Sequence, residues 1–428
     1  MKLTRKEWLK AACTLPLQFT ALAQLTAQGP GGNRGAAPTP LPPLGPAPAL
    51  PDKTSFPRIT GTSLDAAATH PRPEGSLDLI RKAQASQLGE PSGFRSNEAR
   101  VRENFARLVN ADPTEIAIVP ATQIGESYVV AALGISPENH DHIVSDHLHF
   151  VGSLQMYTDM TRRGLDVTWI EIKDNRIPDD ELDRAIVKGR TKLVAISHTS
   201  FVTGFQHDLK RVSDIAHAKG AMVYADIIQA AGNQPLDLTA SGVDAAACAT
   251  YKWLMSAGTA FLYVRKSAMQ KMRPPFYHFT RYTTLLPTTH MYPFDAPARE
   301  IVDNYTVKEG APGMFSTGYE PDTAALAGLE YSLPYIMNIG PAKIQAHAQA
   351  LTDRLKAELP RRGYPLLTPQ ESRAPIVTVA VENAQRLGAD LRAAGVRVTT
   401  RWNHVRISPS VFNDMHDVDR LLAALPKI

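Results

Sequence analysis

The sequence has little of what marks several large classes of protein. Only two of its 428 residues are cysteines, Cys13 and Cys248, so a chain processed beyond Cys13 can form no internal disulfide, and cysteine usage leaves the compartment open. No apolar run is long enough to span a bilayer, and neither a P-loop nor a dinucleotide-binding glycine motif is present. With a net charge of +4 and no dense run of basic residues, the chain is not expected to bind nucleic acid.

What remains is the composition of an ordinary globular protein, with 43% hydrophobic and 21% charged residues. A chain of this length can bury a large core and is expected to form two lobes. We predict four parts. They are an export signal at residues 1–27, a linker at 28–54, a large domain at 55–310 and a small C-terminal domain at 311–428.

The N-terminal segment carries a basic motif, Thr4-Arg5-Lys6, that resembles the twin-arginine export pattern with lysine in place of the second arginine. A mildly apolar stretch to Ala27 follows it. The prediction is therefore export to the periplasm, the alternative being an amphipathic N-terminal helix on a cytoplasmic protein. The next segment, Gly29 to Pro51, holds eight of the 33 prolines and is typical of an extended tether.

Strand-length apolar runs alternate with amphipathic segments through the middle of the chain, which predicts a mainly parallel sheet covered by helices, an α/β fold. Amphipathic helices are predicted at 97–110 and 417–425. The predicted strands are 116–120, 142–146, 167–172, 193–197, 221–225, 245–249 and 260–264.

Two charged residues mark the carboxyl ends of neighbouring predicted strands. Asp226 follows the run at 221–225, and Lys252 follows the run at 245–249. Ligands of α/β sheets bind at this edge. Pyridoxal phosphate (PLP) needs a lysine to form a Schiff base and an acid beside its pyridine nitrogen, and these two residues fit those roles. Each also has an ordinary alternative, a helix N-cap for Asp226 and a solvated surface amine for Lys252.

The residues around Lys252 resemble the class V aminotransferase family, which includes cysteine desulfurases, kynureninases and isopenicillin N epimerase-like enzymes. The family pattern is matched by Val243-Asp244, the small residues Ala245 to Thr250, Tyr251-Lys252, and Gly258-Thr259-Ala260. The resemblance implies the PLP-dependent fold type I, with a seven-stranded mainly parallel sheet in the large lobe and a small α+β C-terminal lobe. It also implies a homodimer. Thr250, Tyr251 and Lys252 would contact the cofactor, Tyr251 standing where most members have histidine.

Four further segments extend the resemblance. Thr122 and Gln123 stand in the family's phosphate turn, although Thr122 is equally an ordinary helix cap. Phe150 stands in the ring-stacking position, and the four histidines between His140 and His149 match no zinc spacing, so no metal is predicted. Gln229 is placed to bond the cofactor's phenolic oxygen, near the loop that begins at His198. Arg406, in an Arg-Ile-Ser segment, matches the family arginine that binds the substrate carboxylate, the alternative being a surface arginine.

The resemblance is less specific about the reaction. No cysteine follows Cys248, so the persulfide chemistry of cysteine desulfurases lacks its nucleophile, and Ser153 stands where kynureninases have aspartate. We therefore predict an aminotransferase acting on a small amino-acid or peptide-amine substrate, with an epimerase or a carbon–sulfur lyase as alternatives. A binding module that keeps the fold without catalysis is the alternative of another class.

Overall fold

The computed structural model describes residues 39–41, 45–90, 93–277, 281, 307–315 and 322–426. The predicted export segment and most of the linker lie outside the described residues. Tyr319, at a position where the resemblance to class V aminotransferases implies a threonine, lies outside them too. So does most of the segment between Tyr277 and Tyr305, from which we expect side chains to line the substrate pocket. Within the described ranges, no helix has both the length and the hydropathy needed to span a membrane.

A seven-stranded sheet forms the centre of the large lobe, in the order β2-β8-β7-β6-β5-β3-β4. All of its pairings are parallel except those that β8 makes with β2 and β7. The strands are β2 (Ile116–Val119), β3 (His142–Asp146), β4 (Asp166–Ile170), β5 (Thr191–Ser197), β6 (Met222–Asp226), β7 (Ala245–Ala249) and β8 (Ala260–Val264). The predicted α/β fold with a mainly parallel sheet is confirmed.

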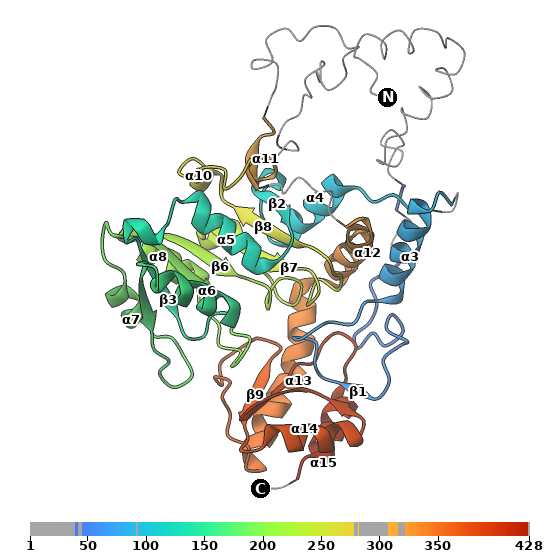
Figure 1. The fold of residues 1–428 in the computed structure, drawn as a ribbon. Helices are drawn as coiled ribbons and strands as arrows, with labels where there is room; N and C mark the ends of the chain where they lie inside the picture. Colours follow the sequence, from blue (N-terminus) through green and yellow to red (C-terminus); the bar gives the residue numbers. More distant parts are fainter. Residues whose placement is uncertain are drawn as a thin grey trace, which may run out of the picture.

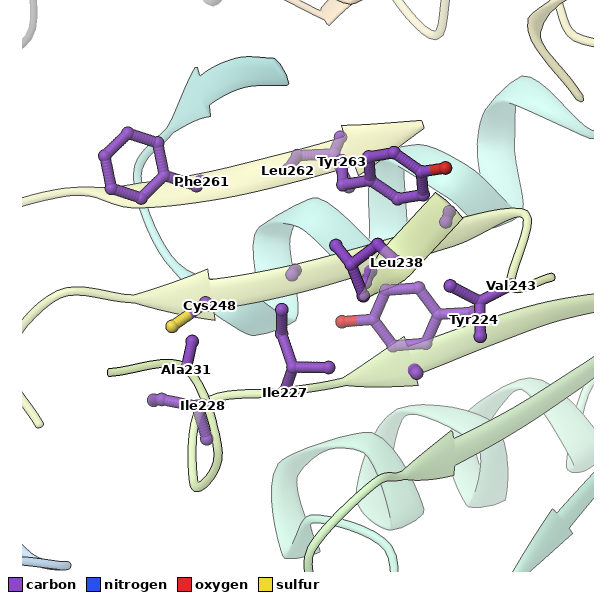
Figure 2. Close-up of a cluster of buried hydrophobic side chains, with 14 of the residues drawn as sticks. Tyr224, Ile227, Ile228, Ala231, Leu238, Val243, Cys248, Phe261, Leu262 and Tyr263 are labelled. Atoms are coloured by element: carbon purple, nitrogen blue, oxygen red, sulfur yellow. The ribbon is translucent and has the colours of Figure 1, made fainter. Parts of the chain in front are cut away.

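The central strands are continuous apolar runs because helices and loops cover both of their faces. Every residue of β6, β7 and β8 is buried. Figure 2 shows how their side chains fill the core, with Tyr224 on β6, Cys248 on β7, and Phe261 and Tyr263 on β8. The small side chains of β7 let the helix α5 (Thr122–Ala132) lie close to the sheet, since a Cβ on Gly125 would come 3.1 Å from that of Ala247.

Helices of the large lobe surround this sheet (Figure 1). The predicted helix at 97–110 is α4, and Asn97 caps it by accepting a hydrogen bond from the Arg100 amide at 3.2 Å. The helices are α3 (Glu74–Gln87), α4 (Glu98–Leu108), α5 (Thr122–Ala132), α6 (Val151–Thr161), α7 (Asp179–Ala185), α8 (Leu209–Ala218), α9 (Leu238–Ser241), α10 (Lys266–Met269), α11 (Gly310–Phe315) and α12 (Thr323–Ile339).

The C-terminal lobe has its own apolar core and a three-stranded antiparallel sheet in the order β11-β12-β9. The long helix α13 runs from the large lobe into it (Figure 1). An N-terminal segment joins this lobe, because β1 pairs in parallel with β10. The elements are β1 (Thr62–Ser63), α13 (Pro341–Arg361), β9 (Val377–Ala380), α14 (Ala384–Ala393), β10 (Val396–Arg397), β11 (Thr399–Arg401), β12 (His404–Ile407) and α15 (Met415–Ala424).

Candidate active site

The predicted acid and lysine lie on neighbouring strands at the same edge of the sheet. Asp226 is the last residue of β6 and is in register with Ala247 on β7. Lys252 comes three residues after Ala249, where β7 ends. The Lys252 charge lowers the pKa of Asp226, and the Asp226 charge raises the pKa of Lys252. The Arg406 charge lowers the pKa of Lys252, so all three groups lie within electrostatic reach of one another.

A tight loop between β7 and β8 positions Lys252. The Met255 amide donates to the Lys252 carbonyl at 2.8 Å, and the Ser256 amide donates to the Thr250 carbonyl at 2.9 Å. Met255 is buried with a φ of 57°, a conformation that disfavours any residue with a Cβ. Strain of this kind persists only where surrounding contacts enforce it, and such positions cluster at functional sites.

The Lys252 side chain is buried, with its amine over an aromatic ring. Its residue is 6% exposed, and in the described part of the chain the amine makes no hydrogen bond or ion pair. Burial lowers the pKa of Lys252 to about 8; Asp226 opposes this shift and Arg406 adds to it. The Tyr251 ring lies beneath the amine, with its centroid 5.7 Å from Nζ. Such an amine is a nucleophile at mildly alkaline pH.

Asp226 is held as an acceptor in an apolar surrounding. Its Oδ1 accepts a hydrogen bond from the Ile228 amide at 2.9 Å. Burial raises the pKa of Asp226 to about 6, although the Ile228 hydrogen bond and the charges of His149 and Lys252 pull in the opposite direction. At neutral pH the carboxylate is therefore ionised in a buried position, where a cationic ring nitrogen would be its natural counter-charge.

The first turn of α5 matches the needs of a phosphate. Ala121 occupies the N-cap and supplies no side-chain hydrogen bond, so the amides of this turn are left for a ligand. Thr122 Oγ1 accepts from the Ala249 amide at 2.8 Å and keeps its own proton to donate. The Thr250 hydroxyl instead donates to the Thr259 carbonyl at 3.0 Å, and Gln123 Nε2 donates to the Gly152 carbonyl at 2.7 Å.

Phe150 stands at the start of α6, above the same edge of the sheet. Its ring meets Phe201 edge-on, with centroids 5.7 Å apart. A Cβ on Gly152 would lie 2.6 Å from the Phe150 ring and 2.7 Å from Gln123 Oε1, so only glycine fits here. This close packing fixes the ring as a flat apolar surface suited to stacking on a heteroaromatic ligand.

Gln229 is buried between two elements that border the site. Its Nε2 donates to the Ala67 carbonyl at 3.1 Å, and its Oε1 accepts from Trp253 Nε1 at 2.9 Å. The amide thus ties the N-terminal segment to the loop of Lys252. The hydrogen bond from Gln229 to the cofactor's phenolic oxygen stays a prediction. Gln229 Nε2 has a second proton with which it could donate that bond.

Arg406 on β12 is buried rather than on the surface. It donates through Nη1 to the Phe201 carbonyl at 2.8 Å and through Nη2 to Thr399 Oγ1 at 2.9 Å, while its buried Nε has no partner in the described structure. Burial lowers the pKa of Arg406 to about 10, and the nearby Asp65 carboxylate partly offsets this. A buried guanidinium with an unpaired donor is suited to an anion.

Sequence reasoning did not identify Glu126 or the role of His149. Glu126 on α5 is 1% exposed and lies 3.1 Å from His149 Nε2. A carboxylate this deeply buried almost always has a dedicated partner, but the two residues are 23 positions apart and nothing in the sequence pairs them. The histidines between 140 and 149 do not converge, and the described residues hold no group of metal ligands. Their contacts are His140 with the Gly164 carbonyl, His142 with Thr168 and Thr191, His147 with Glu171, and His149 with Glu126 and Ser197.

Comparison with known proteins supports the family. The model of the aminotransferase class-V family matches residues 63–421, most of the chain. The chain belongs to the aminotransferase class V family. It is 26% identical to the uncharacterized aminotransferase YcbU of Bacillus subtilis (75% of this chain, 82% of the relative). It is 28% identical to a probable cysteine desulfurase 2 of Mycobacterium leprae (85% of this chain, 90% of the relative).

A solved structure agrees in fold. A C-DES variant with glycine covalently linked to its PLP cofactor has a TM-score of 0.74 and 18% identity, over 87% of this chain and 98% of the other. The predictions of a class V, PLP-dependent enzyme with fold type I are confirmed. The donor set fits this cofactor: an unpaired buried amine, a buried carboxylate, an uncapped helix N-terminus and an aromatic face. The roles of the individual residues remain predictions.

Proposed function

We propose that this class V enzyme is an aminotransferase acting at the Cα amine of a carboxylate-bearing amino acid or peptide amine. The observation that carries the proposal is the amine of the buried residue Lys252, which no described residue binds by a hydrogen bond or ion pair and which lies within electrostatic reach of Asp226 and Arg406. Lys252 and Arg406 each have a donor without a hydrogen-bond partner, and both lie near the buried Asp226 carboxylate. This set of groups matches a substrate that has both an amine and a carboxylate.

Each residue then has a defined task. When bound, PLP supplies the electron sink that allows a bond at Cα to break. Lys252 holds the cofactor and afterwards moves a proton at Cα, and Asp226 retains the proton on the pyridine nitrogen. The first turn of α5 and Thr122 hold the phosphate, and Phe150 covers the ring and excludes water. Arg406 binds the substrate carboxylate through its free donors.

A carbon–sulfur lyase is the second candidate, favoured by several of the proteins to which this chain is similar. These include probable cysteine desulfurases and a cystine C-S lyase with the same fold. The only cysteine in the described structure, Cys248, is buried on β7, and burial raises the pKa of its thiol. We therefore infer that any lyase reaction here proceeds by elimination without a cysteine nucleophile.

Absorbance and product analysis test these proposals. Purified protein with added PLP is expected to be yellow and to lose its visible band on borohydride reduction. A protein that stays colourless and binds no added PLP would overturn the proposed function in favour of a binding module. Incubation of amino acids in heavy water then separates the reactions: keto acid formed with an acceptor indicates an aminotransferase, deuterium at Cα alone an epimerase, and pyruvate without acceptor a lyase.

We also propose a homodimer whose interface borders the active site. Three partly exposed apolar residues, Ile124, Val151 and Tyr251, lie at the starts of α5 and α6 and beside Lys252. Family members build their sites at such an interface. Light scattering on purified protein tests this: a dimer is expected, and a monomer that is fully active would refute it.

Export by a twin-arginine-like route is the proposed localisation, based on Thr4-Arg5-Lys6 and the proline-rich segment after Ala27. Fractionation of cells that produce the full chain tests it. Mature protein is expected in the exported fraction, and replacing Arg5 with Gln should retain it in the cytoplasm. Retention of the unchanged chain in the cytoplasm would overturn this proposal without affecting the enzymatic one.

A further inference from the structure

A buried carboxylate–imidazole pair lies beside the strand that carries Asp226. Glu126 on α5 accepts three side-chain hydrogen bonds, from Tyr157 at 2.7 Å, from Ser153 at 2.5 Å and from His149 Nε2 at 3.1 Å. Both Glu126 and His149 are 1% exposed. The three donors satisfy both oxygens of this buried carboxyl group.

The other ring nitrogen of His149 connects this pair to the site. Nδ1 lies 2.9 Å from Ser197 Oγ. Ser197 ends β5 and is in register with Asp226 at the end of β6. Register partners on parallel strands project from the same face of a sheet. His149 therefore contacts the side chain next to Asp226, on the face where the Asp226 carboxylate lies.

The charges around His149 favour its protonated form. Burial lowers the pKa of His149, but the Glu126 carboxylate, with smaller contributions from Asp146 and Asp226, more than compensates, so the pKa is raised overall. An imidazolium can donate to Glu126 through Nε2 and to Ser197 through Nδ1 at the same time. The other titratable groups that face His149 or Asp226 are Tyr157, His207, which pairs with Asp146, Tyr224, Cys248 and Lys252.

We propose that Glu126 holds His149 as an imidazolium, and that this fixed positive charge keeps Asp226 ionised so that Asp226 can retain a proton on the cofactor's pyridine nitrogen. Charges then alternate from Glu126 through His149 and Asp226 to the ring. Glu126 and His149 are positioning residues, because they act on the cofactor only through Asp226. The inference rests on the proposed function for the identity of the group that Asp226 binds.

The binding of PLP to the cofactor-free protein, measured by absorbance or fluorescence across pH, tests the proposal. Affinity falls as the pH drops through the pKa of Asp226 in the free protein, because a neutral carboxyl cannot pair with a cationic ring. Removing the charge of His149 raises that pKa. In H149Q, the acid limb of the affinity profile is expected to move to higher pH by about one unit. In E126Q it should move in the same direction by less, because losing Glu126 also removes a charge that raises the pKa of Asp226.

His142, on the strand β3 that precedes His149, provides a matched control. It is also 1% exposed, but it lies at the start of β3 and is hydrogen-bonded to two hydroxyls, Thr191 at 2.8 Å and Thr168 at 2.9 Å. H142Q therefore removes a buried histidine without removing a charge near Asp226. S153A removes one hydrogen bond to Glu126 and leaves both charges. Neither variant is expected to move the acid limb.

A second readout is independent of the cofactor. In the unmodified protein, NMR of labelled histidines should show one imidazole, absent from H149Q, that remains protonated where exposed histidines are neutral. It should titrate lower in E126Q. An unshifted acid limb in both E126Q and H149Q, or a His149 that is neutral at neutral pH, would overturn the inference. Should the unmodified protein bind no PLP, the proposed function fails, while the NMR titration still decides the state of the pair.

Discussion

Two buried lysines, one in each lobe, show what distinguishes a reactive amine from a structural one. Lys356 on α13 is 2% exposed, yet its amine donates to the carbonyls of Ser372 at 2.6 Å and Gln370 at 3.1 Å. Lys252 is 6% exposed, and its amine is bonded to no described residue. Burial is the main cause that lowers the pKa of both amines. What separates them is therefore the presence of partners and not the degree of burial.

Two arginines repeat the contrast. Arg265 donates to the carbonyls of Val243, Leu238 and Thr239, each at 3.0 Å, and so joins three segments of backbone. Arg406 is more deeply buried and keeps its Nε without a partner. A buried donor without a partner costs about 1–3 kcal/mol, which a fold tolerates where a ligand supplies the missing bond. The Lys252 amine and Arg406 Nε thus mark where the cofactor and the substrate are expected.

The largest expected effect is that of removing the Lys252 amine. K252A should lose activity by roughly 10³- to 10⁴-fold, because both the covalent attachment of the cofactor and the proton transfer at Cα depend on it. Its thermal stability should not fall, since a buried unpaired amine is removed. Steady-state assays and thermal unfolding check this, with K356A as the control that should retain activity. Comparable loss in the two variants would remove the distinction between the two amines.

At neutral pH, the fraction of Lys252 in the neutral amine form should exceed that of an ordinary lysine by about two orders of magnitude. A pKa near 8 in place of the ordinary lysine value of 10.5 makes the neutral fraction at neutral pH roughly 10²-fold larger. Because the neutral amine is the nucleophile, the rate at which cofactor-free protein takes up PLP should rise with pH and level off above about 8. A rate that still climbs steeply toward the ordinary lysine pKa would contradict the assignment.

The sequence predicted the sheet closely because the strands of a buried parallel sheet are continuous apolar runs, and each of the seven predicted strands lies at its place in the structure. The direction of β8 was not predicted. Only about ten residues separate β7 from β8, too few for the usual parallel crossover and enough for an antiparallel return. This spacing was a usable signal, and it explains the tight loop that holds Lys252.

The site residues were predictable where their role follows from the local sequence. They were not predictable where the role depends on contact between residues far apart in the chain. Asp226 and Lys252 are marked by their positions at strand ends, and Thr122 by its place at a helix start. Glu126 and His149 meet only because α5 and α6 pack at the same edge of the sheet. Whether a buried donor such as Nε of Arg406 has a hydrogen-bond partner also depends on the surrounding fold. The spacing of residues in the sequence does not predict it.

Substitution of the two arginines should separate binding from stability. R406Q is expected to weaken substrate binding by roughly ten- to hundredfold, the value of one or two charge-assisted hydrogen bonds, and chiefly through KM. R265Q should leave KM unchanged and lower stability instead, since three backbone carbonyls lose their donors. Kinetics with an α-amino acid and with its decarboxylated amine check the assignment: R406Q should abolish the preference for the acid. A preference that survives in R406Q would show that another group binds the carboxylate.

The smallest expected effect is at Lys356, and it should appear in stability alone. Methionine has a similar length but no donor, so K356M leaves the carbonyls of Gln370 and Ser372 without their bond. The free energy of unfolding should fall by about 1–3 kcal/mol, while kcat, KM and the bound cofactor's absorbance stay as in the unmodified enzyme. Chemical denaturation measures the first quantity and assays measure the others. K252M is the matched variant in the large lobe, and it should abolish activity. Its free energy of unfolding should be equal or higher, because the Lys252 amine makes no hydrogen bond that the replacement could remove.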